Sequence, residues 1–157
     1  MNVPNFRKID LVTYKPGRSI LSSKKKVIKL SANESAFGAG ERASNVLRNR
    51  NYNISKYPDS KFKKLIETIS KKFNLNKEKI ICGAGSDEII QMICTLFLNK
   101  GDEVVVPQYS FLMYRIYAKI VGAKVKFSKE VNFKVSVDEI LKKVGRNTKI
   151  VFIANPN

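Results

Sequence analysis

The chain has 157 residues, of which 43% are hydrophobic, and this is enough for one domain with a buried core. It contains no histidine, which excludes Ser-His and Cys-His nucleophile pairs and histidine-ligated metals. The formal net charge of +17 would suit nucleic acid, but most basic residues are scattered lysines, and arginine-rich clusters with interleaved aromatics are missing. We therefore expect no nucleic-acid partner.

Targeting features and cysteine usage also limit the class of protein. No apolar run approaches the roughly 20 residues of a membrane-spanning helix, and the start of the chain lacks the apolar stretch of a secretory signal. Cys82 and Cys94 stand in apolar surroundings without a CxxC pair, as reduced core thiols do. These features predict a cytoplasmic protein without a membrane partner.

Residues 1–35 are expected to form an extended N-terminal arm, because Pro4, Pro16 and a lysine run interrupt any periodicity. Residues 36–157 are expected to form one domain that is incomplete at its C-terminus. An apolar strand is followed there by only a few residues, whereas parallel strands need cover on both faces.

Two helices are expected early in this domain. The first covers residues 39–49. Pro58 then biases Tyr57 towards an extended conformation, and Asp59 or Ser60 can cap the second helix. That helix has apolar residues at the spacing of one buried face, namely Phe62, Leu65, Ile66, Ile69 and Phe73.

From residue 79 onward, apolar strands alternate with helices. Strands are expected at residues 79–82, 103–106, 123–127 and 149–153, and helices at residues 87–98, 110–121 and 137–144. The 87–98 helix is apolar around most of its circumference, so we expect it to be well buried, with Gly101 as its C-terminal cap. The alternation predicts a three-layer α/β/α fold with a mostly parallel sheet, whose ligands gather at the carboxyl ends of the strands.

The first candidate site is the segment Gly83-Ala84-Gly85-Ser86-Asp87-Glu88, which follows a strand and opens a helix. Glycines permit a tight turn, and the N–H groups at a helix start, with the Ser86 hydroxyl, can hold a phosphate. The acidic side chains of Asp87 and Glu88 must then turn away from it. A plain glycine turn with Ser86 or Asp87 as N-cap explains this segment equally well. A dinucleotide fingerprint would need glycine in place of Glu88, and the Gly-Lys-Ser/Thr of a P-loop is absent.

The second candidate site is the aromatic segment 107–114, which follows the next strand at the same rim of the sheet. An aromatic ring there, such as that of Phe111, can stack on a flat heteroaromatic ring. Taken alone, Phe111 and Tyr114 are better explained as core contacts of the next helix. Together, the two segments predict a site for a phosphorylated aromatic ring, and pyridoxal 5'-phosphate is such a ligand.

The order of these motifs resembles that of the histidinol-phosphate aminotransferases of pyridoxal-phosphate fold type I. The segments that carry the resemblance are Tyr14-Lys15-Pro16-Gly17, Asn33-Glu34-Ser35-Ala36-Phe37-Gly38, Tyr57-Pro58-Asp59, residues 83–88, 101–104 and 107–114, and Ala154-Asn155-Pro156-Asn157. They correspond in turn to the family's Pro-Tyr-x-Pro-Gly arm, Asn-Glu-Asn-Pro-aromatic-Gly, Tyr-Pro-Asp, Gly-x-Gly-Ser-Asp-Glu, the block that follows it, and the residues just before Asn-Pro-Thr-Gly.

The resemblance implies a pyridoxal-phosphate-dependent transaminase of histidine biosynthesis, with fold type I, a homodimer and small-molecule substrates. These are amino acids or amino-alcohol phosphates, with 2-oxoglutarate. It assigns the cofactor phosphate to Gly85, Ser86 and Asp87, stacking on the pyridine ring to Phe111, and contact with the phosphate of the neighbouring subunit to Tyr57. It also places Asn33 and Glu34 near the substrate mouth, although a hydrogen-bonded arm position explains these two equally well.

The sequence departs from the family where Ser35-Ala36 replaces Asn-Pro, which affects the shape of the arm. The resemblance places the family's Schiff-base lysine, pyridine aspartate, cofactor-hydroxyl asparagine and substrate arginine beyond residue 157. We therefore expect no catalytic residue in this chain and no transamination by the chain alone. The alternatives are a related fold type I enzyme (a threonine-phosphate decarboxylase or an aromatic aminotransferase), an inactive remnant or half of a split enzyme that needs a separate C-terminal half, and a basic binding module.

Overall fold

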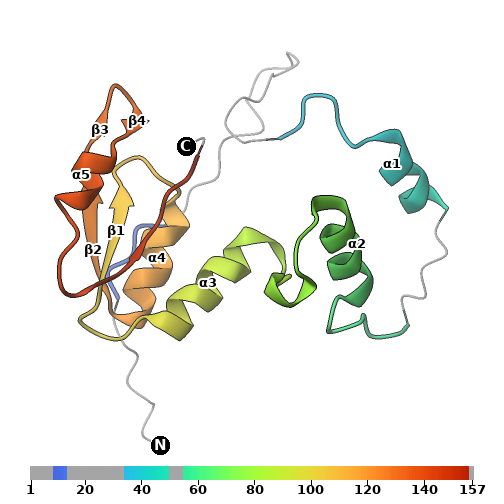
Figure 1. The fold of residues 1–157 in the computed structure, drawn as a ribbon, viewed down its shortest axis with the longest axis horizontal. Helices are drawn as coiled ribbons and strands as arrows, with labels where there is room; N and C mark the ends of the chain where they lie inside the picture. Colours follow the sequence, from blue (N-terminus) through green and yellow to red (C-terminus); the bar gives the residue numbers. More distant parts are fainter. Residues whose placement is uncertain (1–8, 14–33, 50–54, 156–157) are drawn as a thin grey trace, which may run out of the picture. The chain divides into compact units, whose positions relative to one another are not determined.

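The computed structural model describes residues 9–13, 34–49 and 55–155. The chain divides into two compact units: residues 14–61, and residues 1–13 together with 62–157 (Figure 1). The arm expected at residues 1–35 lies largely outside the described residues, and the domain boundary at residue 36 stays a prediction.

The smaller unit contains helix α1, Glu41–Arg48, which confirms the helix predicted at residues 39–49. Glu41 lies in its first turn and Arg48 in its last, so both charges complement the helix dipole. None of the described residues of α1 is buried.

A parallel sheet forms the centre of the larger unit. Its three described strands are β1 (Glu103–Pro107), β2 (Lys124–Ser128) and β5 (Thr148–Val151), in the order β2-β1-β5. Both pairings are parallel. The central strand carries the run Val104-Val105-Val106, which is fully buried, as expected for a strand covered on both faces. This sheet confirms the predicted alternation of strands and helices from residue 103 onward.

The larger unit contains further helices and a hairpin. They are α2 (Lys63–Phe73), the short 3₁₀ helix η1 (Lys77–Lys79), α3 (Gly85–Phe97), α4 (Leu112–Val121), the hairpin strands β3 (Glu130–Val131) and β4 (Lys134–Val135), and α5 (Val137–Leu141). Gly122 ends α4 in the left-handed conformation, as its position in the sequence predicts. The hairpin was not predicted.

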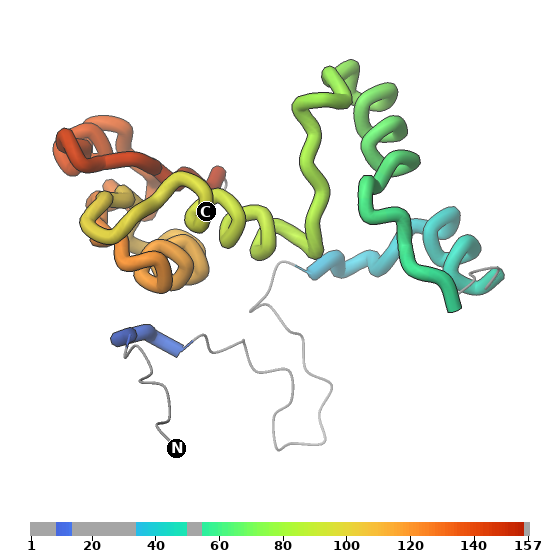
Figure 2. The backbone as a smooth tube through the Cα atoms, turned by 90° about the horizontal axis from the view of Figure 1, so that it is seen from below, coloured from blue at the N-terminus to red at the C-terminus, as the bar shows by residue number. Residues whose placement is uncertain are grey.

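Helices α4 and α5 lie on opposite faces of the sheet (Figure 2). The chain passes from β1 through α4 to β2, and then returns through α5 past β1 to β5, so right-handed crossovers place the two helices on opposite sides. The core agrees: Val104 and Val106 belong to the cluster that includes Ala118 of α4, whereas the intervening Val105 does not. The cluster on the α4 side consists of Ile90, Cys94, Leu98, Val104, Val106, Ala118 and Ala123.

The strand expected at residues 79–82 is wrong. Lys77–Lys79 form η1, capped by the Asn76 side chain, which accepts a hydrogen bond from the Glu78 amide at 2.9 Å. Ile80 is extended, with φ −111° and ψ 124°, but no strand among the described residues pairs with it. An extended backbone becomes a strand only when a neighbour completes its hydrogen-bond ladder.

The predicted start of α2 is also wrong. Phe62, not Asp59 or Ser60, is the residue before the helix, and its φ of 49° is left-handed. Asp59 instead accepts a hydrogen bond from the Lys61 amide at 3.0 Å, in the turn before the helix. The predicted buried face is not seen either, since none of the described residues of α2 is buried.

Helix α3 is confirmed, but the expectation that it is well buried is wrong. Only Ile90 and Cys94 within it are buried, and Met92, Leu96 and Phe97 are exposed. One side of α3 packs against α4, and no other described helix or strand makes more than marginal contact with it. Gly101 does not cap it: Leu98 is the C-cap, and Gly101 donates its N–H to the Gly122 carbonyl at 3.2 Å in the turn before β1.

Candidate functional site

The turn before α3 is built on glycine. The Gly85 amide donates a hydrogen bond to the Gly83 carbonyl at 2.8 Å, which closes a tight turn. Gly85 has φ +82°, a left-handed conformation that glycine adopts without steric cost. The first turn of α3 therefore begins directly after the turn, and it presents Ser86 and Asp87.

This first turn offers donors to an anion. The amides of Ser86 and Asp87 belong to the helix start, where N–H groups have no intrahelical acceptor and the dipole is positive. Ser86 is exposed, and a Cβ built on Gly85 would meet nothing within 4 Å. Donors beside open space are what a phosphate needs, so these residues fit the phosphate of pyridoxal phosphate.

Both acidic side chains of the turn point elsewhere. Glu88 Oε2 accepts a hydrogen bond from the Ala84 amide at 2.5 Å, and so it lies on the Gly83 side of the turn. Asp87 Oδ1 is buried and has no hydrogen-bond partner among the described residues. Burial of the Tyr117 phenol, followed by the charge of Asp87, raises the pKa of Tyr117. The open space above Gly85 therefore keeps its positive character.

The second segment, after β1, contributes aromatic rings. The Ser110 hydroxyl donates to the Pro107 carbonyl at 2.7 Å, and Phe111 is the residue that precedes α4. The Phe111 ring stands perpendicular to that of Tyr114, with centroids 5.7 Å apart and an interplanar angle of 89°. Tyr114 packs against the core, whereas Phe111 remains 38% exposed. The core interpretation of this segment thus holds for Tyr114, while Phe111 keeps surface that a ligand could contact.

The two segments begin helices that pack against each other. Ile90 and Cys94 of α3 and Ala118 of α4 belong to one core cluster, and among the described elements α4 makes the main contact with α3. Phe111 follows the carboxyl end of β1, which is the rim where ligands of parallel sheets bind. Ser86 and Phe111 therefore stand at the N-termini of two neighbouring helices.

The remaining predicted site residues fall in the smaller unit. Tyr57 and Glu34 are exposed and belong to the smaller unit, and Asn33 lies outside the described residues. Their roles stay predictions.

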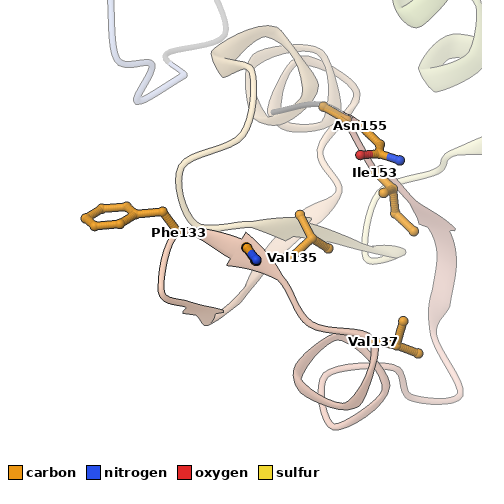
Figure 3. Close-up of a pocket in the computed structure, with 7 residues that line it drawn as sticks. Phe133, Val135, Val137, Ile153 and Asn155 are labelled. Carbon is orange, nitrogen blue, oxygen red and sulfur yellow. The ribbon is translucent and has the colours of Figure 1, made fainter.

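A separate hollow of about 540 Å³ was not predicted from the sequence (Figure 3). Its lining comes from the β3–β4 hairpin, the start of α5 and the segment after β5, and consists of Phe133, Lys134, Val135, Val137, Ile153, Ala154 and Asn155. Ile153 alternates with Ile150 and Phe152 of the α4-side core. The hollow accordingly lies towards the α5 side, and its lining residue Phe133 also contacts Tyr109 of the loop after β1. The sequence carried no usable signal for it, because the two-residue strands of the hairpin are too short to show an alternation.

The described residues contain neither a metal site nor a membrane-spanning helix. No group of three or more acidic or cysteine side chains there could hold a metal ion, and none of the described helices is long and apolar enough to cross a membrane.

Comparison with known proteins identifies relatives. The family "Aminotransferase class I and II" matches residues 25–157. The histidinol-phosphate aminotransferase of Pelagibacter ubique (strain HTCC1062) is 64% identical over 157 residues, which is 100% of this chain and 44% of that protein. That of Rhodopseudomonas palustris (strain BisA53) is 42% identical over 156 residues, or 99% of this chain and 43% of that protein. The chain thus spans less than half the length of these relatives.

Solved structures show the fold. The histidinol-phosphate aminotransferase from Sinorhizobium meliloti in complex with pyridoxal-5'-phosphate has a TM-score of 0.69 at 22% identity, over 74% of this chain and 32% of that one. A Thermus thermophilus aspartate aminotransferase mutant has a TM-score of 0.67 at 19% identity, over 80% of this chain and 36% of that one. This likeness confirms the predicted fold class.

Proposed function

The chain belongs to the class I and II aminotransferase family. We propose that it provides the site that binds the cofactor phosphate in a histidinol-phosphate aminotransferase. The observation that carries the proposal is the glycine turn with open space above Gly85, followed by the first-turn amides of α3. The relative that is 64% identical over the whole chain, a histidinol-phosphate aminotransferase, supports the choice of substrate.

Gly85, Ser86 and Asp87 would hold the phosphate. The amides of Ser86 and Asp87 and the Ser86 hydroxyl donate, and the helix dipole adds attraction for the dianion. Asp87 Oδ1 is buried, so this oxygen is not exposed to the open space above Gly85.

Phe111 would lie against the pyridine ring and exclude water from one of its faces. When bound, pyridoxal phosphate withdraws the electron pair that is released as a bond to the amino-bearing carbon of the substrate breaks. Gly85, Ser86, Asp87 and Phe111 bind and orient the cofactor in this proposal, and none of them is assigned the proton transfer.

The further partners are part of the same proposal. Tyr57, whose side chain is exposed, would reach the phosphate bound by a neighbouring subunit of a homodimer, and Asn33 and Glu34 would lie near the substrate. The substrates would be an amino-alcohol phosphate and 2-oxoglutarate, and the setting the cytoplasm, where amino-acid biosynthesis takes place.

Binding of pyridoxine 5'-phosphate tests the proposed phosphate-binding site. This probe has no aldehyde, so it cannot form imines with the many lysines of the chain. A fluorescence titration should give tighter binding than pyridoxine, which lacks the phosphate. Ser86→Ala should weaken binding about tenfold to hundredfold, since a hydrogen bond to a charged group contributes about 1.5–3 kcal/mol. Thr95→Ala is the matched control, because its hydroxyl donates to the Gln91 carbonyl further along the same helix. Equal affinities for pyridoxine and pyridoxine 5'-phosphate would contradict the proposal that Gly85, Ser86 and Asp87 bind the phosphate.

The substrate assignment is tested separately. The assay needs this chain together with the C-terminal half that its relatives contain. With 2-oxoglutarate as amino acceptor, that protein should consume histidinol phosphate in preference to tyrosine. Carbon dioxide release from O-phosphothreonine would favour the decarboxylase instead.

A further inference from the structure

The loop that joins β1 to α4 (residues 108–111, the β1–α4 loop) is hydrogen-bonded to the sheet on both sides of Tyr109. Gln108 donates its N–H to the Ser128 carbonyl of β2 at 3.0 Å, and the Ser110 hydroxyl donates to the Pro107 carbonyl of β1 at 2.7 Å. The Tyr109 amide lies between them and donates to a side chain, the carboxylate of Glu130, with 3.1 Å between N and Oε1. The conformation of this loop therefore depends on a residue 21 positions further along the chain.

Glu130 is itself held in place by its neighbours. It begins β3, shortly after the buried Ser128 at the end of β2, and it pairs with Val135 in the β3–β4 hairpin. Its side chain is half-buried. A carboxylate that accepts from a backbone N–H makes a stronger hydrogen bond than a neutral acceptor does. Glu130 can therefore hold the Tyr109 amide in competition with water.

The hairpin makes a second contact with the same loop. The ring centroids of Phe133 and Tyr109 lie 5.9 Å apart, with an interplanar angle of 38°. Both rings are largely exposed, so little apolar surface is removed from water by this contact. The hydrogen bond from Tyr109 to Glu130 is accordingly the contact between hairpin and loop that carries the inference.

The position of the β1–α4 loop connects it to the proposed function. The loop follows the carboxyl end of β1, at the rim where parallel sheets bind ligands, and the proposed function places the pyridine ring of the cofactor against it. The phosphate is assigned to a different segment, the first turn of α3. A change in the loop should therefore affect the ring and the phosphate differently.

We propose that Glu130 is a positioning residue, which acts through the Tyr109 amide to hold the β1–α4 loop in the conformation that receives the pyridine ring. This inference rests on the proposed function, because it concerns the loop against which that proposal places the ring. It predicts that Glu130 affects binding of the ring and leaves binding of the phosphate unchanged.

The experiment measures two ligands on the 157-residue chain by calorimetry, pyridoxine 5'-phosphate and inorganic phosphate. Glu130→Ala should weaken binding of pyridoxine 5'-phosphate about fivefold to tenfold, because the loop then spends only a fraction of its time in the binding conformation. Inorganic phosphate should bind within about twofold of the original chain, because its donors lie at the start of α3. Glu130→Gln should restore binding of pyridoxine 5'-phosphate to within about threefold, since its side-chain oxygen can accept the same hydrogen bond.

Two further variants and one further readout make the result specific. Hydrogen exchange of the Tyr109 amide, followed by NMR without ligand, should be faster in Glu130→Ala and slow again in Glu130→Gln. Glu130→Asp keeps the charge but draws the carboxylate back by one methylene, so it should weaken binding of pyridoxine 5'-phosphate even if Glu130→Ala does not fold. Glu139→Ala is the matched control, because its carboxylate pairs with Lys142 at 2.5 Å. This variant should leave all readouts unchanged.

The failures of the two proposals are distinguishable. If folded Glu130→Ala or Glu130→Asp binds pyridoxine 5'-phosphate as tightly as the original chain, or loses inorganic phosphate to the same extent, the positioning role is overturned. If the original chain itself binds pyridoxine and pyridoxine 5'-phosphate equally, the proposed function fails, and the positioning role fails with it.

Discussion

The carboxylate of Glu88 closes back over the turn that precedes its own helix, where Oε2 accepts the Ala84 amide at 2.5 Å. The same oxygen would stand 2.8 Å from a Cβ built on Gly83. Glu88 and Gly83 therefore fit together, as in a capping box, in which an acidic side chain of the first turn satisfies a backbone donor before the helix. This arrangement also keeps the Glu88 charge away from the open space above Gly85.

The first prediction concerns that hydrogen bond. Glu88→Ala should lower the free energy of unfolding by about 1–2 kcal/mol, because it leaves the Ala84 amide without its acceptor. Glu88→Gln keeps an oxygen at the same place and should lose less than half as much. Urea denaturation followed by circular dichroism measures both. Equal losses for the two variants would mean that the charge, not the hydrogen bond, carries the effect.

The second prediction separates the two glycines of the turn. Gly83→Ala should displace the Glu88 carboxylate, because its Cβ would lie 2.8 Å from Oε2. Its cost should therefore overlap with that of Glu88→Ala, so the double variant is less destabilised than the sum of the single ones. Gly85→Ala meets no atom within 4 Å and is strained only by its φ of +82°, at about 1–2 kcal/mol. That cost should add fully to the cost of Glu88→Ala in the same denaturation experiment.

The third prediction concerns Cys94, which is fully buried. Burial raises the pKa of the Cys94 thiol from 9.0 to about 11. The folded state therefore keeps a proton that the unfolded state releases, so this stabilisation is complete below pH 9 and declines as the pH rises towards 11. The loss is on the order of 2 kcal/mol. Other groups titrate in this range, so the measurement is the difference in unfolding free energy between the original chain and Cys94→Ala as the pH is raised. A constant difference would contradict the assignment.

The fourth prediction concerns the β3–β4 hairpin. Asn132 and Phe133 both adopt left-handed conformations, with φ values of 51° and 59°. A bulky residue is strained in this conformation by about 1–2 kcal/mol, and Asn-Gly is the preferred pair for such a turn. The Phe133 ring is 85% exposed, so its contact with Tyr109 recovers little. Phe133→Gly should therefore raise the thermal midpoint by a few degrees, as followed by calorimetry. A lower midpoint would show that the Tyr109–Phe133 contact outweighs the strain.

The parallel sheet could be predicted because its signals are local. Val104 to Val106 form an apolar run of strand length, and Gly122 marks the end of the helix that precedes the next strand. The turn at Gly83 and Gly85 was predictable for the same reason, since a left-handed residue at a helix start leaves a mark in the sequence. The need for Asp87 and Glu88 to turn away followed from charge alone.

Features that depend on distant contacts could not be predicted. Residues 79–82 look like a strand, but pairing is decided by a neighbour that local periodicity does not reveal. The β3–β4 hairpin has two-residue strands, too short for an alternation to be recognised, and Phe133 stands where a glycine would have marked the turn. The stack of Tyr114 on Phe152 joins segments on either side of β2 and α5, so this contact was beyond sequence reasoning.

The last prediction tests which side of α3 supports the fold. Ile90 is 8% exposed and belongs to the core cluster, whereas Leu96, on the same helix, is 77% exposed. Ile90→Ala should lower the free energy of unfolding by about 2–4 kcal/mol, because it removes buried methyl groups and leaves a cavity. Leu96→Ala should change it by no more than about 0.5 kcal/mol, since little apolar area is lost from contact. Both substitutions end in alanine, so helix propensity favours neither strongly, and the difference reports burial. Denaturation of the two variants at equal concentration measures that difference. A large loss for Leu96→Ala would mean that this side of α3 is covered in solution, and would restore the expectation from the sequence that the helix is buried around most of its circumference.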